Sequence, residues 1–299
     1  MITYNHEAFL AEALESVLAQ QTDFVIEVVV GEDCSTDRTR DILKKYAQSH
    51  PGVVRPVLHE KNVGVGANFD MTFAAARGKY VAFLEGDDYW SDSTKLARQV
   101  AWLERDAEIR ICFHPVLVVG AEHHLLGKFM PAPRRWRAFW PVEELFEGNF
   151  VNTCSVVMPR AAVPEFGASF AGVVMRDWPI FIFAAQTGKI AFLDEPMACY
   201  RIHGGGVWTG EPPLAQVEME LAMWDVMRGR VEKRYRRLVF KRCMTCHAAR
   251  LGHLAGAGRM TRLRVLGAWI CAAVGARVWR GRAFCGLLGE ALAARHRRV

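Results

Sequence analysis

The sequence has no long uninterrupted apolar run, although 51% of its 299 residues are hydrophobic. A helix that spans a bilayer needs about 20 predominantly apolar residues. The most apolar stretch, residues 263–278, contains Arg264 and Arg277, which leave only twelve uncharged residues between them. We therefore predict no certain membrane span and favour an interfacial or core helix there. The N-terminus has no basic region followed by an apolar one, so no signal peptide is visible and a cytoplasmic location is expected.

The eight cysteines show no paired spacing of the kind that frames a small secreted protein. Most are single residues in apolar surroundings and are predicted to be core residues, among them Cys112, Cys154, Cys199 and Cys271. The exception is Cys243-Met-Thr-Cys246-His247, which matches the attachment pattern of haem c. Because this segment reads as a helix and no second cysteine pair lies nearby, we favour a chance pattern over a haem or metal site.

Acidic residues are scarce in the last quarter of the chain. Residues 228–299 contain 18 Lys and Arg and only two acids, a balance of +16, whereas residues 1–227 balance to −10. Such a tail indicates contact with an anionic surface, or else a solvated helical face rich in arginine. No nucleic-acid-binding motif accompanies it. We therefore favour peripheral contact with anionic lipid at the inner face of the cell membrane, with nucleic acid as the weaker alternative.

Helix and strand patterns alternate over the first hundred residues. Apolar residues at three- and four-residue spacing predict helices, and short β-branched runs predict buried strands. Helices are expected at residues 6–20, 35–49, 64–76 and 92–104, and strands at 25–30, 53–58 and 80–84. This alternation predicts an α/β fold with a parallel sheet covered by helices on both faces.

The opening strand covers only Met1 to Thr3, because a helix follows almost at once. Two or three residues are too few for a strand in the centre of a sheet. We expect either a clipped strand or a true start upstream of Met1, and we favour the second.

The pattern changes further along the chain. Strands are expected at residues 111–119, 154–158 and 190–193, a helix at 179–187, and a loop rich in Pro, Arg and Trp at 131–140. Beyond residue 210 the pattern is helical, with candidates at 214–228 and 231–254. We therefore divide the chain into an α/β domain, residues 1–210, and a basic helical region, residues 211–299.

Three polar clusters fall at the carboxyl ends of the expected strands, where open parallel sheets bind their ligands. They are Thr3-Tyr4-Asn5, Glu32 to Asp37, and Glu85-Gly86-Asp87-Asp88. Several carboxylates in one pocket suit a divalent cation such as Mg²⁺, which can bridge a diphosphate and stabilise its departure. The alternative is that the acids after the third strand only cap the helix that follows.

Four motifs together resemble the family 2 glycosyltransferases. They are Thr3 to Glu7, Glu32 to Asp37, Asn62-x-Gly64-x-x-x-Asn68 and Leu84 to Trp90, and they occur in the family's order and spacing. The similarity covers residues 1–210. It implies a GT-A fold, an inverting transfer, a nucleotide-sugar donor that is commonly a UDP-sugar, and Mn²⁺ or Mg²⁺. It also implies a glycan or lipid-linked glycan acceptor in bacterial surface polysaccharide synthesis.

The resemblance assigns roles to individual residues. Thr3 and Tyr4 would line the nucleotide base, and Asp33 would accept the uracil imide hydrogen. The metal ligands would come from Asp87, Asp88 and His203, and Arg201 would pair with phosphate. The full set expected to bind the nucleotide sugar is Thr3, Tyr4, Glu7, Asp33, Asn62, Asn68, Glu85 and Arg201.

The catalytic base is expected later in the chain, at Asp177, because Met175-Arg176-Asp177-Trp178 resembles the family's acceptor-side motif. Such a base removes the proton of the attacking hydroxyl. The alternative is that Asp177 serves only the N-terminus of the next helix. The Gln-x-x-Arg-Trp motif of processive relatives is absent after Asp177, which favours the addition of single sugars. Trp136, Phe139, Trp140 and Trp178 could stack on sugars, although single aromatics are more often core residues.

Two competing functions stay open. One is a non-catalytic protein that binds a sugar nucleotide in the same fold, which loss of Asp177 or of Asp87 and Asp88 would have favoured. The other is a nucleic-acid binder that acts through the basic tail.

Overall fold

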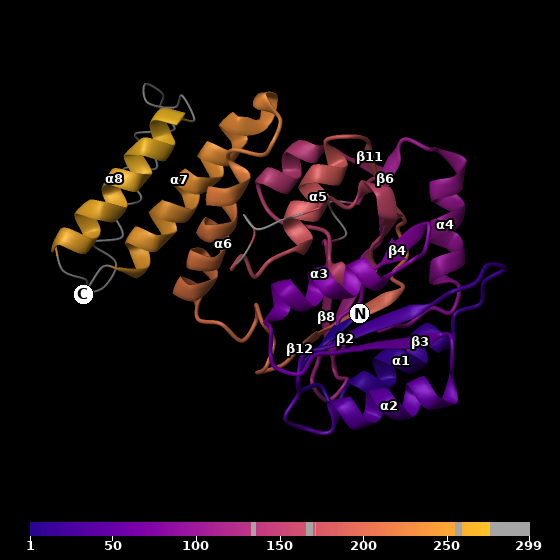
Figure 1. Cartoon of the computed structure of the whole chain (residues 1–299). Helices are drawn as coiled ribbons and strands as arrows, with labels where there is room; N and C mark the ends of the chain where they lie inside the picture. Colours follow the sequence, from indigo (N-terminus) through magenta and orange to yellow (C-terminus); the bar gives the residue numbers. More distant parts are fainter. Residues whose placement is uncertain (133–135, 166–169, 171, 255–258, 276–299) are drawn as a thin grey trace. The chain divides into compact units, whose positions relative to one another are not determined.

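The computed structural model describes residues 1–132, 136–165, 170, 172–254 and 259–275 (Figure 1). Its residues divide into two compact units. The first contains residues 1–145, 149–172 and 176–204, and the second contains residues 146–148, 173–175 and the described residues from Gly205 onward. The expected boundary after residue 210 lies close to this division.

The first unit is built on parallel strands. β1 (Ile2–Thr3), β2 (Val28–Glu32) and β3 (Val54–Leu58) are parallel in the order β1-β2-β3. A parallel bridge from Ile2 to Glu85 leads from β1 towards the next sheet. The order there is β4 (Tyr80–Ala82), β10 (Val157–Pro159), β6 (Ile109–Phe113), β11 (Lys189–Phe192) and β9 (Phe139–Trp140). β6 and β11 are parallel, whereas β10 and β9 run against their neighbours.

Five helices accompany these strands: α1 (Leu10–Leu18), α2 (Thr39–Ser49), α3 (Val65–Ala75), α4 (Lys95–Arg105) and α5 (Asp177–Ala185). In Figure 1, α3 lies on one side of β2 and β3, and α1 and α2 lie on the other. α1 shows why: Leu10, Ala13, Leu14 and Val17 form one buried stripe at helical spacing. The predicted α/β fold with a mostly parallel sheet is confirmed.

The strand expected at residues 111–119 is two strands in two different sheets. β6 ends at Phe113, and β7 (Val116–Gly120) joins a sheet of order β5 (Tyr89–Trp90), β12 (Ala198–Ile202), β7 and β8 (Leu125–Met130). Between them stands His114-Pro115. Proline has no N–H for a ladder, so the chain leaves one sheet there and enters the other. The sequence pattern did not predict β8, whose side chains are mostly exposed.

A cavity of about 380 Å³ lies beside β1, and its lining includes Met1, Phe69, Tyr80 and Trp90. The terminal amine of Met1 donates to the Val29 carbonyl at 2.8 Å, which continues the β1–β2 ladder to the first residue. The two-residue length of β1 agrees with the short strand read from the sequence. A start upstream of Met1 stays a prediction.

The second unit contains α6 (Pro213–Met227), α7 (Arg236–His253) and α8 (Arg259–Gly275). None of the helices within the described residues is long and apolar enough to cross a membrane. Cys243 and Cys246 are buried on α7, and the Cys246 thiol contacts a Glu220 carboxylate oxygen on α6 at 3.1 Å. The haem-like string is thus part of a helix–helix contact. The basic residues of 276–299 lie outside the described residues.

Candidate active site

The turn after β1 and the loop after β2 are joined by hydrogen bonds. Asn5, with a φ of 54°, turns the chain after β1. The His6 amide donates to Thr39 Oγ1 at 2.7 Å, and the Glu7 amide donates to Asp37 Oδ2 at 3.0 Å. The Glu7 carboxylate in turn accepts the Arg38 amide at 3.0 Å. Glu7, expected in the donor site, therefore holds the two loops together.

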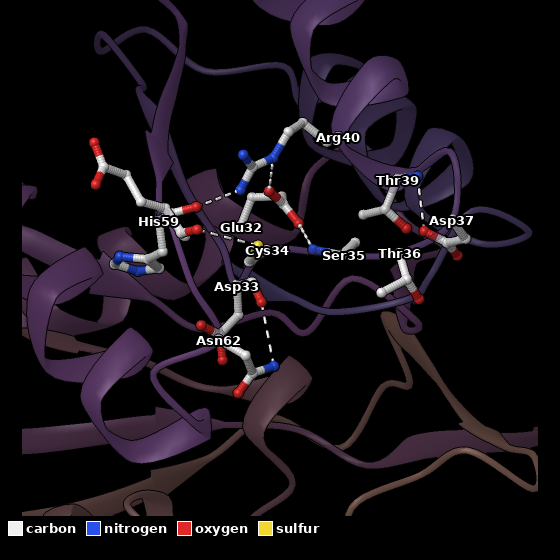
Figure 2. A network of polar contacts seen from close by, with 12 residues as sticks. Glu32, Asp33, Cys34, Ser35, Thr36, Asp37, Thr39, Arg40, His59 and Asn62 are labelled. Carbon is white, nitrogen blue, oxygen red and sulfur yellow. Dashed lines mark hydrogen bonds and ion pairs between the residues drawn. The ribbon is translucent and has the colours of Figure 1, made fainter.

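Glu32 and Asp33, at the end of β2, have different hydrogen-bond partners (Figure 2). Glu32 is completely buried, accepts the Ser35 amide at 2.6 Å and pairs with Arg40. Asp33 is also buried, and its two carboxylate oxygens accept the amides of Val63 and Gly64 at 2.7 and 3.0 Å. Asp33 therefore shapes the loop after β3. Each carboxylate oxygen can accept a second hydrogen bond, so these contacts are compatible with the expected contact to a uracil imide. That contact stays a prediction.

The two asparagines expected to bind the donor have different surroundings. Asn62 donates to the Asp33 carbonyl at 3.2 Å and lies in the same loop cluster (Figure 2). Asn68 is buried on α3, donates to the Gly31 carbonyl at 3.0 Å and shares its amide oxygen with His59 and Thr72. These contacts give Asn68 a structural role between α3 and β2, and its expected contact with the donor stays a prediction.

Gly86 explains how the acidic segment reaches the turn after β1. A Cβ at Gly86 would lie 2.6 Å from Thr3 Oγ1 and 2.9 Å from His6 Nδ1, so a larger residue would displace this turn. Thr3 is buried, whereas Tyr4 is 41% exposed. Of the two residues expected to line the base, only Tyr4 presents a side chain to solvent.

The three acids after β4 have three different environments. Asp87 Oδ2 lies 2.9 Å from His203 Nε2 and 3.8 Å from His6 Nε2. Burial alone would raise the pKa of Asp87, but the hydrogen bond from His203 and the charges of His6 and His203 bring it below its usual value. Burial, together with Asp87 and Asp177, raises the pKa of Glu85 to about 8.

Asp88 does not join the other two as expected. Its carboxylate accepts the Arg201 amide at 2.8 Å and lies against β12, where burial and then the charges of Asp87 and Glu85 raise its pKa well above the usual value. The assignment of Asp88 as a metal ligand is not supported by this placement. Gly86 and Asp87 lie in a turn that the Asp88 amide closes by donating to the Glu85 carbonyl at 3.3 Å, and the strand β5 begins only after Asp88.

Arg201 is fully buried rather than open to phosphate. Its guanidinium donates to Glu12 Oε2 at 2.5 Å, to the Asp87 carbonyl at 2.8 Å and to the Ala121 carbonyl at 3.2 Å. The rings of Phe9 and Tyr89 cover its two sides, 4.8 and 5.3 Å from the guanidinium carbon. The expected bidentate contact with phosphate has no free pair of N–H groups here. Arg201 instead supports the segment that carries Asp87.

Asp177 is the first residue of α5, and its Oδ2 accepts a hydrogen bond from the side-chain amide of Asn149 at 2.8 Å. Burial raises the pKa of Asp177, against the hydrogen bonds from Trp178 and Asn149 that lower it. The neighbouring Arg176 turns away and pairs with Asp70 at 3.0 Å. The position at the helix start and the raised pKa are compatible with both roles considered for Asp177.

Two of the four aromatic residues proposed to stack on sugars are core residues. Trp178 and Trp140 are each only 4% exposed, and Trp178 donates to the Leu145 carbonyl at 2.6 Å. Burial excludes stacking for both. Trp136 is half-buried, and Phe139 is 47% exposed.

A possible metal site is formed by His6, Asp87 and His203, whose ligand atoms all lie within 4.8 Å of one another. Two imidazoles and one carboxylate can hold a divalent ion, so the residues present fit a metal. The sequence predicted Asp87 and His203 for this role and missed His6. The signal available was its place in the Thr3 to Glu7 motif, at the same sheet edge as the acids. Asn149, the partner of Asp177, had no signal in the sequence.

Comparison with known proteins agrees with this geometry. The family model described as Glycosyl transferase family 2 matches residues 1–138. An uncharacterized protein of Mycobacterium tuberculosis is 42% identical over 207 residues, which are 69% of this chain and 59% of that protein. An uncharacterized glycosyltransferase of Nostoc is 33% identical over 67% of this chain and 63% of its own length. The chain thus spans about three fifths of these two relatives.

A curated enzyme and a solved structure extend the comparison. The Escherichia coli protein WfaP, named a UDP-Glc:alpha-D-GlcNAc-diphosphoundecaprenol beta-1,3-glucosyltransferase, is 25% identical over 68% of this chain and 76% of its own length. The crystal structure of S. aureus TarS 1-349 with UDP-GlcNAc matches 98% of this chain and 86% of that one, with a TM-score of 0.66 and 18% identity, which establishes the fold. Residues 1–138 therefore form a family 2 glycosyltransferase domain.

Proposed function

We propose that this chain transfers a single sugar from a UDP-sugar to a hydroxyl of a glycan or lipid-linked glycan, with inversion at the anomeric carbon. One observation carries the proposal: the ligand atoms of His6, Asp87 and His203 gather within 4.8 Å of one another, and the charges of Asp87 and Asp177 both act on the neighbouring buried Glu85. The acids after β4 and the first residue of α5 therefore lie within one another's electric field. A metal site and a base that act on one substrate must be close in this way.

Asp177 is the proposed base. A carboxylate whose pKa is raised towards the working pH accepts a proton more readily in the transition state. The side-chain amide of Asn149 donates to Oδ2 and so orients the carboxylate that would receive the proton of the attacking acceptor hydroxyl. Attack from the side opposite the diphosphate inverts the anomeric centre.

Asp87 and His203 are proposed to hold Mn²⁺ or Mg²⁺ together with the donor diphosphate. Such an ion, when bound, stabilises the negative charge that develops on the departing diphosphate. Tyr4, Asp33 and Asn62 lie in the loops after β1, β2 and β3, and these loops are proposed to bind the nucleotide. The names of two related proteins support the donor and acceptor classes, since TarS was solved with UDP-GlcNAc and WfaP is named for UDP-Glc and a lipid-linked acceptor.

The test is donor binding and hydrolysis across UDP-, GDP- and dTDP-sugars, with and without Mn²⁺ or Mg²⁺, for the wild type and Asp177→Asn. We expect metal-dependent binding of one UDP-sugar, retained by Asp177→Asn while turnover falls by about 10²–10⁴-fold. Asp23→Asn, an exposed carboxylate-to-amide change, is the matched control and should leave both unchanged. Binding without turnover in the wild type, across a panel of glycan and lipid-linked acceptors, would instead favour the non-catalytic sugar-nucleotide binder.

We also propose that the helical unit contacts anionic lipid, which would place the enzyme beside a lipid-linked acceptor. An exposed basic cluster extends from the end of α6 into the first turn of α7 and is made of Arg228, Arg230, Lys233, Arg234, Arg236 and Arg237. Each basic side chain near an anionic bilayer contributes about 1 kcal/mol of binding free energy.

Co-sedimentation with vesicles of anionic or purely zwitterionic lipid tests this contact. The wild type should bind anionic vesicles at physiological salt, and Arg234→Glu together with Arg237→Glu should reduce that binding by about 10-fold or more. Binding to RNA or DNA but not to vesicles would favour the nucleic-acid alternative.

A further inference from the structure

The imidazole of His6 lies beside Asp87 and His203, the two residues proposed to hold the metal. Its Nε2 is 3.8 Å from Asp87 Oδ2, and His203 Nε2 is 2.9 Å from the same oxygen. Two ligand atoms that each lie about 2.1 Å from one ion are at most about 4 Å apart. Both measured separations fall within this limit, and all three ligand atoms lie within 4.8 Å of one another, so small side-chain rotations can bring all three to one ion without a change of backbone.

The two imidazoles are held in place by their surroundings. The Phe9 ring packs against both, with centroids 6.4 Å from His6 and 4.9 Å from His203, and the two histidine rings are 6.0 Å apart. The His6 backbone is fixed by its bond to Thr39, and Gly86 allows the acidic segment to approach the ring. Ligands that are oriented before binding lose little entropy when an ion arrives.

Ligand chemistry decides which ion this set prefers. Mg²⁺ takes oxygen ligands in a nearly ideal octahedron and gives up its water reluctantly. Imidazole nitrogen suits first-row transition ions, and two histidines with one carboxylate are a recurrent set for such ions with open coordination positions. Asp88, whose oxygen would have favoured Mg²⁺, faces β12 instead.

We infer that His6 is a third protein ligand, and that the set His6, Asp87 and His203 selects a first-row transition ion such as Mn²⁺ over Mg²⁺. This inference rests on the proposed function only in that the donor diphosphate would fill the remaining positions. The selectivity belongs to the protein ligands, so it is measurable without any sugar nucleotide.

The experiment is equilibrium binding of Mn²⁺ to the donor-free protein, followed by the paramagnetic resonance signal of the free ion, with Mg²⁺ as competitor. For the wild type, Mg²⁺ should displace half of the Mn²⁺ only at an excess of about 100-fold or more. His6→Gln should weaken Mn²⁺ binding by about 10–100-fold. His50→Gln, which changes an imidazole on the first residue after α2, should bind Mn²⁺ as the wild type does.

Two further measurements separate a ligand from a merely structural histidine. His6→Asp replaces nitrogen by oxygen and should shift the Mn²⁺/Mg²⁺ preference towards Mg²⁺ by about 10-fold or more while retaining binding. Spin-echo modulation of bound Mn²⁺ should show two coupled imidazole nitrogens in the wild type and one in His6→Asp. A single nitrogen in the wild type, or an unchanged preference in His6→Asp, would overturn the inference. Selective Mn²⁺ binding without sugar transfer would instead count against the proposed function alone.

Discussion

Two regions of the molecule bury carboxylates, and each treats the charge differently. In the helical unit, Glu220 on α6 receives Arg242 Nε at 2.5 Å and Nη2 at 3.0 Å, and Trp224 Nε1 at 2.8 Å. At the end of β4, Glu85, Asp87 and Asp88 stand next to one another. Among the described residues their ion-pair partners are the imidazoles of His6 and His203, with no lysine or arginine.

The difference in ion-pair partners distinguishes a carboxylate with a structural role from carboxylates that are proposed to bind a cation. A buried charge is tolerated when an opposite charge with good hydrogen bonds accompanies it. Glu220 has such a partner within the protein. Asp87 has only imidazole partners, and burial and the charges of neighbouring carboxylates raise the pKa values of Glu85 and Asp88. The proposed function would place a divalent ion beside these acids.

The largest effect on stability should follow from removing Arg242, the arginine that pairs with Glu220 in the helical unit. Arg242→Met leaves Glu220 buried without its charge partner, which should lower the free energy of unfolding by about 3–5 kcal/mol. Urea denaturation of the full chain measures the change. The double variant Glu220→Met with Arg242→Met is the control, because it removes both charges and should recover most of the loss. If the double variant is as unstable as the single one, packing and not charge holds these helices together.

The second effect compares the two neighbouring acids of the site. Asp87→Asn should reduce Mn²⁺ affinity by at least about 100-fold, because it removes the only carboxylate of the proposed metal site. Asp88→Asn should change the affinity by less than about 10-fold, since Asp88 faces β12. Titration with Mn²⁺ measures both. Equal losses in the two variants would mean that the binding conformation differs from the one described.

Local patterns predicted most of the fold. The stripe of Leu10, Ala13, Leu14 and Val17 predicted α1, and the β-branched run of β3 predicted a strand, because each depends on a few neighbouring side chains. The split at His114-Pro115 was missed because β6 and β7 are equally apolar, and only the sheets that receive them differ. Strand β12 was missed because its partners β5 and β7 lie far away in sequence.

The candidate site was predicted in position but not in the direction of its side chains. Resemblance to the family motifs assigned Asp87 and His203 to one metal site, and these two side chains lie 2.9 Å apart. Which of Asp87 and Asp88 faces His203, and whether Arg201 is open or buried, depends on how β12 pairs with its neighbours. His6 was missed because its role depends on Phe9 and Gly86, which carry no catalytic signature themselves.

The third effect sharpens the comparison with a buried cation. Lys95 is completely buried, with Nζ 2.8 Å from Gln99 Oε1 and 4.3 Å from the Trp90 ring centroid, and burial lowers its pKa to about 7. Between the folded pKa of about 7 and the ordinary lysine pKa of about 10.4, the unfolded chain keeps the proton that the folded protein has released. Stability should therefore rise with pH there, by up to about 1.4 kcal/mol per unit.

Urea denaturation at several pH values tests this sign. Lys95→Met should abolish the rise that Lys95 contributes, whereas Lys79→Met, a change of an exposed lysine, should leave it in place. A rise that persists in Lys95→Met would assign the pH dependence to another group.

The smallest effect comes from a second ion pair between α6 and α7. Arg250 Nε lies 2.6 Å from Glu218 Oε1, but the two side chains are 31% and 42% exposed. Water already solvates both charges, so Glu218→Gln should lower the free energy of unfolding by less than about 1 kcal/mol. Because Glu218 and Glu220 lie on one helix and both pair with an arginine of the next, the ratio of the two losses isolates the contribution of burial. A loss for Glu218→Gln as large as that for Arg242→Met would show that position on the helix pair, and not burial of the carboxylate, sets the cost. The difference between Glu220 and the acids after β4 would then be explained by the closeness of those acids to one another, and not by their burial.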